Sequence, residues 1–435
     1  MLLQEIFPPP LRGLGIKSLL SNDSILAFFK KFCDEIISRM WRTKKARNLR
    51  YEDSDFLKVF FFSEIIGRSI HDTSEMLNEY QLSRKRGRRR IFADGRRKRM
   101  IPHQTEVNKY LRRIGLAKAR TILRKCLDFQ LKEAIDKKII SQKVSVLIDF
   151  TEHPYYGKRE DNMIKGTNRQ KGTKKMRHYL GFSIFSRNTQ LFAGLEHVAK
   201  GQSKIPLIND FLFHLFDIGF EFDFVMMDRE FYRAELIDEV KSMGGDSLIP
   251  AKMYKKIKKM VEEYLSGRSG RTRAYKFSTT PGGRHKCVQE VYLIFNAKRG
   301  YSLLGLKRAV RKGELTIEDA RKKIFVIMTT RKPKGKQSSW ASRTSRFYRK
   351  RWNIETGFSD LNRINRRWKS NHDNVRYLDM LVRMLLYNSW KINKKLLKNL
   401  GKKPSSTKGW TLNRNNDLLT QLAFSLEKKS QGVIG

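Results

Sequence analysis

The sequence predicts an α/β protein in which a mixed sheet flanked by helices follows an all-α N-terminal region. Apolar residues recur at helical spacing until about residue 139, and short apolar, β-branched runs typical of buried strands begin at Lys143. Two of these runs, at 143–150 and 221–228, carry an aspartate at or near their ends. With 435 residues, the chain is also long enough for several domains and a sizeable core.

Helical spacing predicts four N-terminal helices, at 25–41, 55–66, 74–80 and from Pro102 onward. Residues 1–23 are expected to form an irregular arm, because three consecutive prolines exclude helix there. Short helices followed by one with polar and basic residues near its start, Lys109 among them, resemble a helix-turn-helix DNA reader. A small helical bundle gives the same pattern. We assign residues 1–138 to a helix-turn-helix-like, DNA-binding region.

Net charge is the outlying property of the composition. The chain has 92 Lys and Arg against 43 Asp and Glu, which gives +49. Such an excess implies a polyanion partner. It is dense over residues 83–100, where more than half of the residues are basic, and we expect this run to contact DNA phosphates, with a solvated loop as the alternative. The candidate contacts are Arg88, Arg89, Arg90, Arg96 and Arg97.

Several other classes of protein fit the sequence less well. Cys33, Cys126 and Cys287 are far apart and form no CxxC pair, so we expect reduced thiols and a cytosolic protein. The eight histidines form no HExxH motif or His/Cys cluster, which argues against a zinc site. Neither a signal peptide nor a long apolar run is found, so secretion and membrane spanning are not expected.

The central region alternates strands and helices. The expected segments are a strand at 143–150, two strands within 177–198 joined at Arg187–Asn188, a helix at 203–220, a strand at 221–228, a helix at 231–243 and a strand at 246–252. We assign residues 139–251 to the first part of a sheet core. Ligands bind at the carboxyl ends of parallel strands in open sheets, which is where we expect Asp149 and Asp228.

Residues 252–340 interrupt this alternation. They begin with a basic helix, and strands are predicted at 287–296 and 322–330. We interpret the segment as a β-rich insertion that separates the sheet from its last helix. Residues 341–400 then complete the core, and residues 401–435 form a basic C-terminal tail.

The last helix of the core is predicted over Phe347–Trp368, and its spacing gives two faces. The apolar stripe consists of Phe347, Ile354, Phe358 and Leu361. The neighbouring stripe consists of Tyr348, Arg351, Glu355 and Asn362. Glu355 therefore lies at the margin of a buried face, where a carboxylate needs a cation or a metal ion. The alternative is an ordinary surface ion pair between Arg351 and Glu355.

Asp149, Asp228 and Glu355 are the candidates for a shared metal site. Cleaving or joining a phosphodiester needs an activated nucleophile and a stabilised leaving oxygen, which two divalent ions about 3.5–4 Å apart provide. Mg²⁺ prefers a few carboxylates and keeps water or substrate oxygens in its remaining positions. Each aspartate could instead cap the segment after it. Glu152 and Glu230 are expected behind these ligands or in solvent.

The helix motif resembles the last motif of DDE-type insertion-sequence transposases, in particular the insertion sequence four (IS-four) family. That motif reads Tyr, two residues, Arg, three residues, Glu, six residues, Lys. Tyr348, Arg351 and Glu355 match it, whereas Asn362 stands at the Lys position and Arg363 follows it directly. The resemblance implies that Tyr348 and Arg351, with Asn362 or Arg363, contact DNA near the cleaved end.

Two further segments extend the resemblance over about residues 140–395. IDFTEHPYYG, with Asp149, resembles the first motif of related transposases, and MDREFY, with Asp228, resembles the second, usually DRGFY. The resemblance implies an RNase H-like catalytic core with a β-rich insertion. It also implies that Asp149, Asp228 and Glu355 are catalytic and bind two Mg²⁺ ions, with Mn²⁺ expected to substitute.

We therefore predict a DDE transposase that binds terminal inverted repeats, nicks the transposon ends with water and joins the freed 3′ hydroxyl to target DNA. The expected partners are double-stranded DNA, at transposon ends and target, and a second copy of the chain. No membrane partner is expected, and the location is a prokaryotic cytoplasm, at the nucleoid. The alternatives are an inactive or domesticated DNA-binding derivative and a site-specific endonuclease.

Three features beside these motifs have two interpretations each. Trp340 and Trp352 flank the last motif and could stack on an unpaired base, with core packing favoured for Trp352. The basic segment 165–177 is predicted to be a loop, either close to bound DNA or simply solvated.

Overall fold

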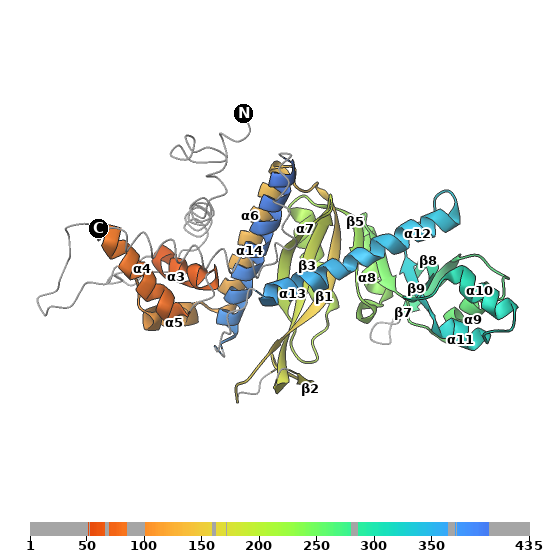
Figure 1. Ribbon diagram of the computed structural model, residues 1–435, viewed down its shortest axis with the longest axis horizontal. Coiled ribbons are helices and arrows are strands. Elements are labelled where there is room, and N and C mark those ends of the chain that lie inside the picture. The colour runs from red at the N-terminus through yellow and green to blue at the C-terminus, as the bar shows by residue number, and fades with distance from the viewer. Residues whose placement is uncertain are drawn as a thin grey trace, which may run out of the picture. The chain divides into compact units, whose positions relative to one another are not determined.

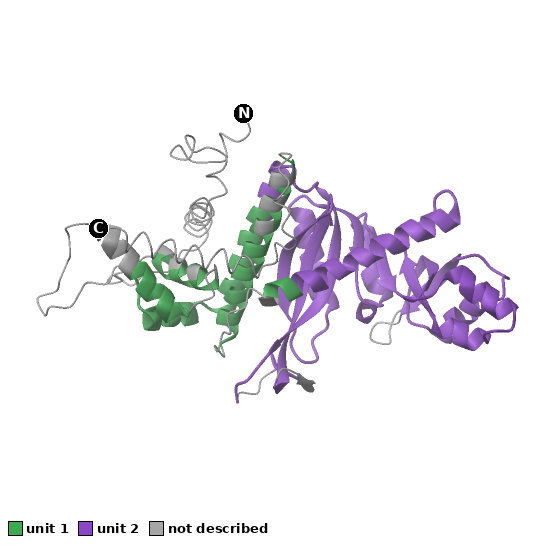
Figure 2. Cartoon of the chain, in the orientation of Figure 1, with its two compact units in different colours: residues 1–130, 359–435 green, residues 131–358 purple. Residues whose placement is uncertain are grey.

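The computed structural model describes residues 51, 53–65, 69–84, 101–158, 162–170, 172–279, 286–363, 370 and 372–399 (Figure 1). The chain divides into a helical unit, residues 1–130 and 359–435, and a sheet unit, residues 131–358 (Figure 2). The predicted helix at 25–41 and the tail at 401–435 lie outside the described residues. Of the helices described, none has the length and apolar composition needed to cross a bilayer.

The described helices of the helical unit are α3 (Asp53–Ile65), α4 (Ile70–Arg84), α5 (Gln104–Arg113), most of α6 (Leu116–Asp136) and α14 (Asp373–Asn399). The apolar spacing predicted helices in the regions of α3, α4, α5 and α6. Helix α4 begins and ends outside the range predicted for it, 74–80. Residues 85–103 separate α4 from α5, far more than the three or four residues of a helix-turn-helix turn. These two helices are therefore not joined by such a turn.

Buried polar contacts connect the helices of this unit. Arg383 of α14 is 4% exposed, pairs with Asp379 at 2.9 Å and approaches Glu64 of α3 at 3.7 Å. Because an unpaired buried charge costs several kcal/mol, this cluster fixes how α3 and α14 meet. Gln130 of α6 donates a hydrogen bond of 3.0 Å to the carbonyl of Leu385, and α6 and α14 run side by side (Figure 1).

The sheet unit is built on one mixed sheet flanked by helices, which confirms the predicted α/β core. Its strands are β1 (Lys143–Pro154), β2 (Lys165–Gln170), β3 (Thr173–Ser186), β4 (Thr189–His197), β5 (Glu221–Met226), β6 (Asp246–Pro250), β7 (Thr272–Thr279), β8 (Cys287–Ala297) and β9 (Ile324–Thr329). Their order is β2-β3-β1-β5-β6-β9-β8-β7, and β4 pairs with β3. Strands β1, β5 and β6 are parallel, as the alternation with helices predicted.

Helices and one tight turn complete the unit. The helices are α7 (Ile205–Asp217), η4 (Arg229–Phe231), α8 (Ala234–Ser242), α9 (Lys255–Leu265), α10 (Leu303–Arg311), α11 (Ile317–Lys322), α12 (Gln337–Tyr348), η6 (Arg349–Arg351) and the start of α13 (Trp352–Arg363). Strands β3 and β4 turn at Arg187 and Asn188, whose φ angles of 48° and 60° are those of a type I′ hairpin. The hairpin prediction is confirmed.

The segment interpreted as an insertion, 252–340, contributes strands to the same sheet. Strand β9 pairs antiparallel with β6, and β8 and β7 follow it outward. Helices α9, α10 and α11 also belong to this segment. The segment therefore widens the central sheet and contains both strands and helices.

The described part of the helix predicted over 347–368, residues 347–363, consists of the end of α12, the short 3₁₀ turn η6 and helix α13. Most of its apolar stripe is buried: Ile354 is 0% and Phe358 5% exposed, whereas Phe347 is half-buried. A Cβ atom placed on Gly181 of β3 would lie 2.0 Å from Cζ of Phe358, so only a glycine lets this ring lie on the strand. A Cβ atom placed on Gly357 of α13 would likewise lie 3.0 Å from Cζ of Phe192 in β4. These contacts fix the start of α13, and with it Glu355, on the sheet.

Replacing Gly181 with alanine should move α13. The added methyl group overlaps the Phe358 ring, and overpacking of this kind costs about 1–3 kcal/mol. We expect the free energy of unfolding in urea to fall by that amount. Gly166→Ala in β2, where a Cβ meets nothing within 4 Å, is the matched control. Equal stability of the two variants would show that the packing of the Phe358 ring does not require the space at Gly181.

Candidate active site

The parallel pairing of β1 and β5 brings the two predicted aspartates to the same level of the sheet. Leu147 is the partner of Met226, and Asp149 and Asp228 each lie two residues further along. Neighbouring strands are about 4.8 Å apart, so the two side chains emerge close together. Asp149 is not at the end of its strand, as the sequence suggested, because β1 continues to Pro154 in pairing with β3. It lies where β5 stops covering β1.

Neither aspartate side chain caps the segment after it. Asp228 precedes η4, but its side chain makes no capping hydrogen bond. Asp149 lies within β1, and its Oδ1 accepts a bond of 2.9 Å from the backbone N–H of Phe150. The capping alternative therefore does not account for either residue.

Arg351 connects two of the three predicted carboxylates. Its Nη1 donates to Oδ2 of Asp149 at 2.9 Å, and its Nη2 donates to Oε1 of Glu355 at 2.6 Å. The Arg351 and Asp149 side chains are 10% and 13% exposed, whereas Glu355 is 43% exposed. The Arg351–Glu355 contact is therefore more than a surface ion pair, because its cation is buried and shared with Asp149 of the sheet.

Burial and charge act against each other at this site. Burial raises the pKa of Asp149 to about 6, with further increases from Glu355 and Asp228, although Arg351 and the Phe150 N–H act in the opposite direction. Burial lowers the pKa of Arg351, but Tyr348, Asp149, Glu355 and Asp228 raise it above its usual value. Arg351 thus remains a cation, and Asp228 acts electrostatically on both residues.

The donor set fits a divalent cation. Oxygens of Asp149 and Glu355 already converge on one positive group, the guanidinium, whose Nε has no hydrogen-bond partner among the described residues. The ligand oxygens of Asp149, Asp228 and Glu355 do not all lie within 4.8 Å of one another. The side chains must therefore rearrange to hold one ion together, and Glu355 is the most exposed of the three.

A family model described as a transposase DDE domain matches residues 140–389, more than half of the chain. The chain belongs to the transposase DDE-domain family. The IS-four resemblance is consistent with this match. A search of curated protein sequences gives no match.

Family membership explains why carboxylates gather here. DDE transposases generally use divalent metal ions. The matched range begins shortly before β1 and contains Asp149, Asp228 and Glu355. The expectation of a transposase is confirmed at this level, and the three carboxylates are the candidates for holding the metal in this chain.

Tyr348 of this transposase lies behind the carboxylates and is only 7% exposed. Its hydroxyl donates a long hydrogen bond of 3.4 Å to the carbonyl of Met227, next to Asp228. Burial raises the pKa of the Tyr348 hydroxyl above its usual value. In this structure Tyr348 supports the segment that carries Asp228.

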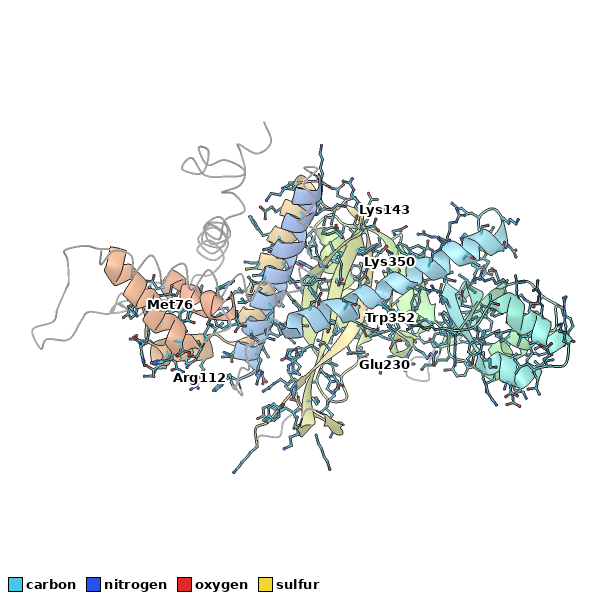
Figure 3. The ribbon with its side chains drawn as sticks, viewed as in Figure 1. Met76, Arg112, Lys143, Glu230, Lys350 and Trp352 are labelled. Carbon is cyan, nitrogen blue, oxygen red and sulfur yellow. The ribbon has the colours of Figure 1, made fainter. Side chains whose placement is uncertain are left out.

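The prediction that Trp352 packs in the core is wrong. Trp352 is 64% exposed at the start of α13, whereas Trp340 is 5% exposed within α12. Trp352, labelled in Figure 3, is the first residue of α13 after η6. Helical spacing alone did not predict this, because the 3₁₀ turn changes the phase between α12 and α13.

Basic partners of the neighbouring acidic residues were missed by sequence reasoning. Lys204 pairs with Glu230 at 2.8 Å, and its ammonium also lies 4.4 Å from the centre of the Phe150 ring. His178 contacts Glu152 at 3.3 Å. These pairs give both glutamates partners other than a metal ion. No sequence signal indicated Lys204 or His178, because they reach the site through α7 and β3.

The remaining predicted DNA contacts are only partly described. Lys109 is exposed on α5 of the helical unit. Asn362 and Arg363 are the last residues of α13, and their side chains are outside the description. The basic run from 85 to 100, which includes the predicted contacts Arg88, Arg89, Arg90, Arg96 and Arg97, also lies outside the described residues.

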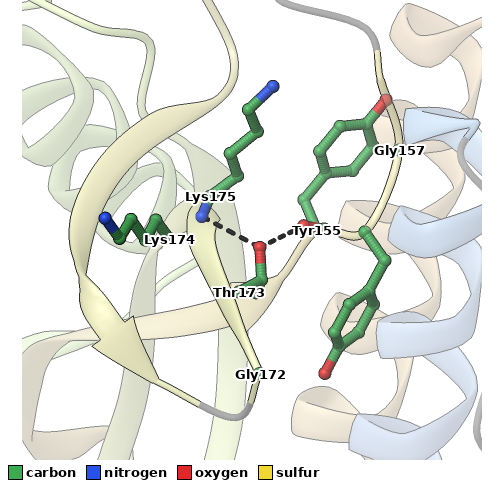
Figure 4. Close-up of a pocket in the computed structure, with 7 residues that line it drawn as sticks. Tyr155, Gly157, Gly172, Thr173, Lys174 and Lys175 are labelled. Atoms are coloured by element: carbon green, nitrogen blue, oxygen red, sulfur yellow. Dashed lines mark hydrogen bonds between the residues drawn. The ribbon is translucent and has the colours of Figure 1, made fainter.

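A pocket of about 410 Å³ lies at the far end of β1, between Tyr155–Gly157 and Gly172–Lys175 (Figure 4). The Thr173 hydroxyl donates to the Tyr155 carbonyl at 2.8 Å and closes its base. Part of the segment predicted as a loop, 165–177, is thus strand β2 and the start of β3. Tyr155 is six positions after Asp149, and at about 3.3 Å per residue of strand the two residues are roughly 20 Å apart. The pocket is therefore not the carboxylate site.

The raised pKa of Asp149 predicts a pH-dependent stability in metal-free protein. A carboxyl whose pKa is about 6 in the folded chain, against an ordinary value of 3.8, destabilises the fold as pH rises from about 4 to 6. Asp149→Asn removes this effect. Relative to wild type, the variant should gain roughly 2 kcal/mol between about pH 4 and 7, measured by urea unfolding with chelator.

Asp217→Asn, at an exposed end of α7, controls for the loss of one negative charge. Curves for Asp149→Asn and wild type that stay parallel across this pH range would contradict the burial of Asp149.

Proposed function

We propose that this transposase binds the terminal inverted repeats of a mobile element and moves it by metal-dependent strand cleavage followed by strand transfer. The observation that carries the proposal is the single ion-pair network through which Arg351 joins Asp149 and Glu355, with Asp228 level with Asp149 on the adjacent strand. The match to the transposase DDE domain supports the reaction class.

Asp149, Asp228 and Glu355 are proposed to hold two Mg²⁺ ions, in a core of RNase H-like type. When bound, the ions lower the pKa of an attacking water and stabilise the leaving 3′ oxygen. Asp149 provides a fixed ligand because its side chain is only 13% exposed, and Glu355 provides an adjustable one because α13 leaves it 43% exposed. Lys204 and His178 keep Glu230 and Glu152 engaged beside this site.

Arg351 is proposed to have two states. Without metal, its guanidinium neutralises Asp149 and Glu355. With metal held by these carboxylates, the guanidinium would be free to fork onto a DNA phosphate. Trp352, exposed next to it, offers a face on which a base can stack. Tyr348 is buried, and its proposed contact with DNA requires a local movement of α12.

DNA binding is proposed to extend to the helical unit. The net charge of +49 provides strong, salt-dependent attraction to phosphates. Lys109, the run with Arg88, Arg89, Arg90, Arg96 and Arg97, and the Asn362–Arg363 pair are the proposed contacts. The helical N-terminal region, residues 1–138, is the proposed reader of the repeat. Two copies bridging two ends, in the prokaryotic nucleoid, complete the proposal.

The deciding experiment measures cleavage of a labelled duplex that carries the terminal repeat. Wild-type protein should cut it with Mg²⁺ or Mn²⁺ and not with chelator. Glu355→Gln keeps the size of the side chain but removes a ligand charge. We expect its rate to fall by more than about 100-fold, since losing an outer-shell partner alone costs about 10- to 100-fold.

Glu314→Gln, an exposed glutamate outside the carboxylate site, is the matched control and should cut like wild type. Metal-dependent cutting by Glu355→Gln at the wild-type rate would refute the role of Glu355. Cutting without joining of pre-cut ends to target DNA would identify an endonuclease, and binding without cutting would identify a DNA-binding derivative.

Arg351→Lys tests the forked contact. Lysine keeps the charge but cannot bind two groups with a rigid fork, so cleavage should slow by roughly 10- to 100-fold. Arg349→Lys, exposed in the same 3₁₀ turn, should change little. The measurement is single-turnover cleavage at saturating DNA. Equal rates for the two variants would exclude a specific role for the Arg351 fork.

A further inference from the structure

Three ligand-type side chains of the helical unit gather away from the catalytic carboxylates. His71 and Glu75 lie one turn apart on α4, and His103 is the N-cap residue of α5. Their ligand atoms all lie within 4.8 Å of one another. The two imidazole rings meet edge to face, with centroids 5.8 Å apart and an interplanar angle of 84°. The rings are therefore not stacked on each other.

Buried hydrogen bonds hold His103 at this place. On α4, the Ser74 hydroxyl donates to the carbonyl of Pro102 at 2.7 Å. The Asn78 side chain accepts from the N–H of Ile101 at 2.9 Å and donates to its carbonyl at 3.2 Å. Ser74 is 0% and Asn78 5% exposed. The segment before His103 is thus fixed against the helix that carries His71 and Glu75.

His103 must exchange one hydrogen bond to bind a metal ion through Nε2. Its Nδ1 accepts a long capping bond of 3.4 Å from the Thr105 N–H and lies 3.0 Å from the Thr105 hydroxyl. A histidine that binds metal through Nε2 donates its Nδ1–H to a nearby oxygen. In the metal-bound form, the Thr105 hydroxyl would accept that proton and the capping bond from the Thr105 N–H would be lost.

The donors select the class of ion. Two imidazoles and one carboxylate suit Zn²⁺ and other late first-row divalent ions, whereas Mg²⁺ prefers oxygen ligands alone. In a tetrahedral zinc site with bonds of about 2.0–2.1 Å, the ligand atoms are about 3.3 Å apart. His71 is exposed and Glu75 half-buried, so rotamer changes can close the remaining gap.

We propose that His71, Glu75 and His103 bind one divalent transition-metal ion, Zn²⁺ by its donor set, that joins α4 to α5. Residues 76–102 connect Glu75 to His103 in sequence, so the ion closes a loop that contains the basic run 85–100. The sequence predicted no zinc site because these ligands match no motif: the first two are four positions apart and the last two twenty-eight positions apart. The site does not depend on the proposed function.

The test is metal binding by full-length, chelator-treated protein in excess Mg²⁺, which occupies oxygen-only sites. Co²⁺ is added as a visible-absorbing probe and then displaced with Zn²⁺. Wild type should bind one equivalent of Co²⁺ with the absorption of tetrahedral nitrogen and oxygen ligands, without thiolate charge transfer. His103→Ala should weaken Zn²⁺ binding by more than about 100-fold.

His372→Ala, an exposed histidine of the same unit, is the matched control and should bind like wild type. Far-UV circular dichroism checks that each variant is folded. If His103→Ala unfolds, Glu75→Gln replaces it and should weaken binding at least about tenfold. No tetrahedral Co²⁺ spectrum in wild type, or equal affinity in wild type and the cluster variants, would overturn the proposal.

Discussion

The guanidinium of Arg351 determines how two distant parts of the chain meet, because it binds Asp149, 202 residues away, and Glu355, one turn further along its own segment. A buried carboxylate such as Asp149 is unfavourable unless a cation accompanies it. Arg351 supplies that cation in this structure. In the proposed function a divalent ion takes this role, which would leave Arg351 free for DNA.

The sheet holds Glu355 in position relative to Asp149. The absence of a side chain at Gly181 lets the Phe358 ring lie on the strand that pairs with β1 at Asp149. The Phe358 ring contacts Gly181, and Gly181 pairs with Asp149 in the sheet. The position of α13, and with it that of Glu355, is therefore set relative to Asp149. The more exposed Glu355 remains able to adjust.

Charge is distributed differently in the two units. In the sheet unit, lysines and histidines pair with the glutamates beside the site, as in Lys204 with Glu230 and His178 with Glu152. In the helical unit, buried charges connect helices, and His71, Glu75 and His103 form a nitrogen-rich cluster. Oxygen-only ligands in one unit and imidazoles in the other would let the chain bind two different metals without competition.

The sequence by itself determined the α/β class, the parallel strands, the hairpin at Arg187–Asn188 and the three candidate carboxylates, because periodicity and turn chemistry are local properties. Only the tertiary structure decided which partner each charge takes. Strand pairing placed Asp149 within β1, the 3₁₀ turn exposed Trp352, and the packing of α4 brought His71 to His103. These outcomes depend on contacts between residues far apart in sequence, which no local pattern encodes.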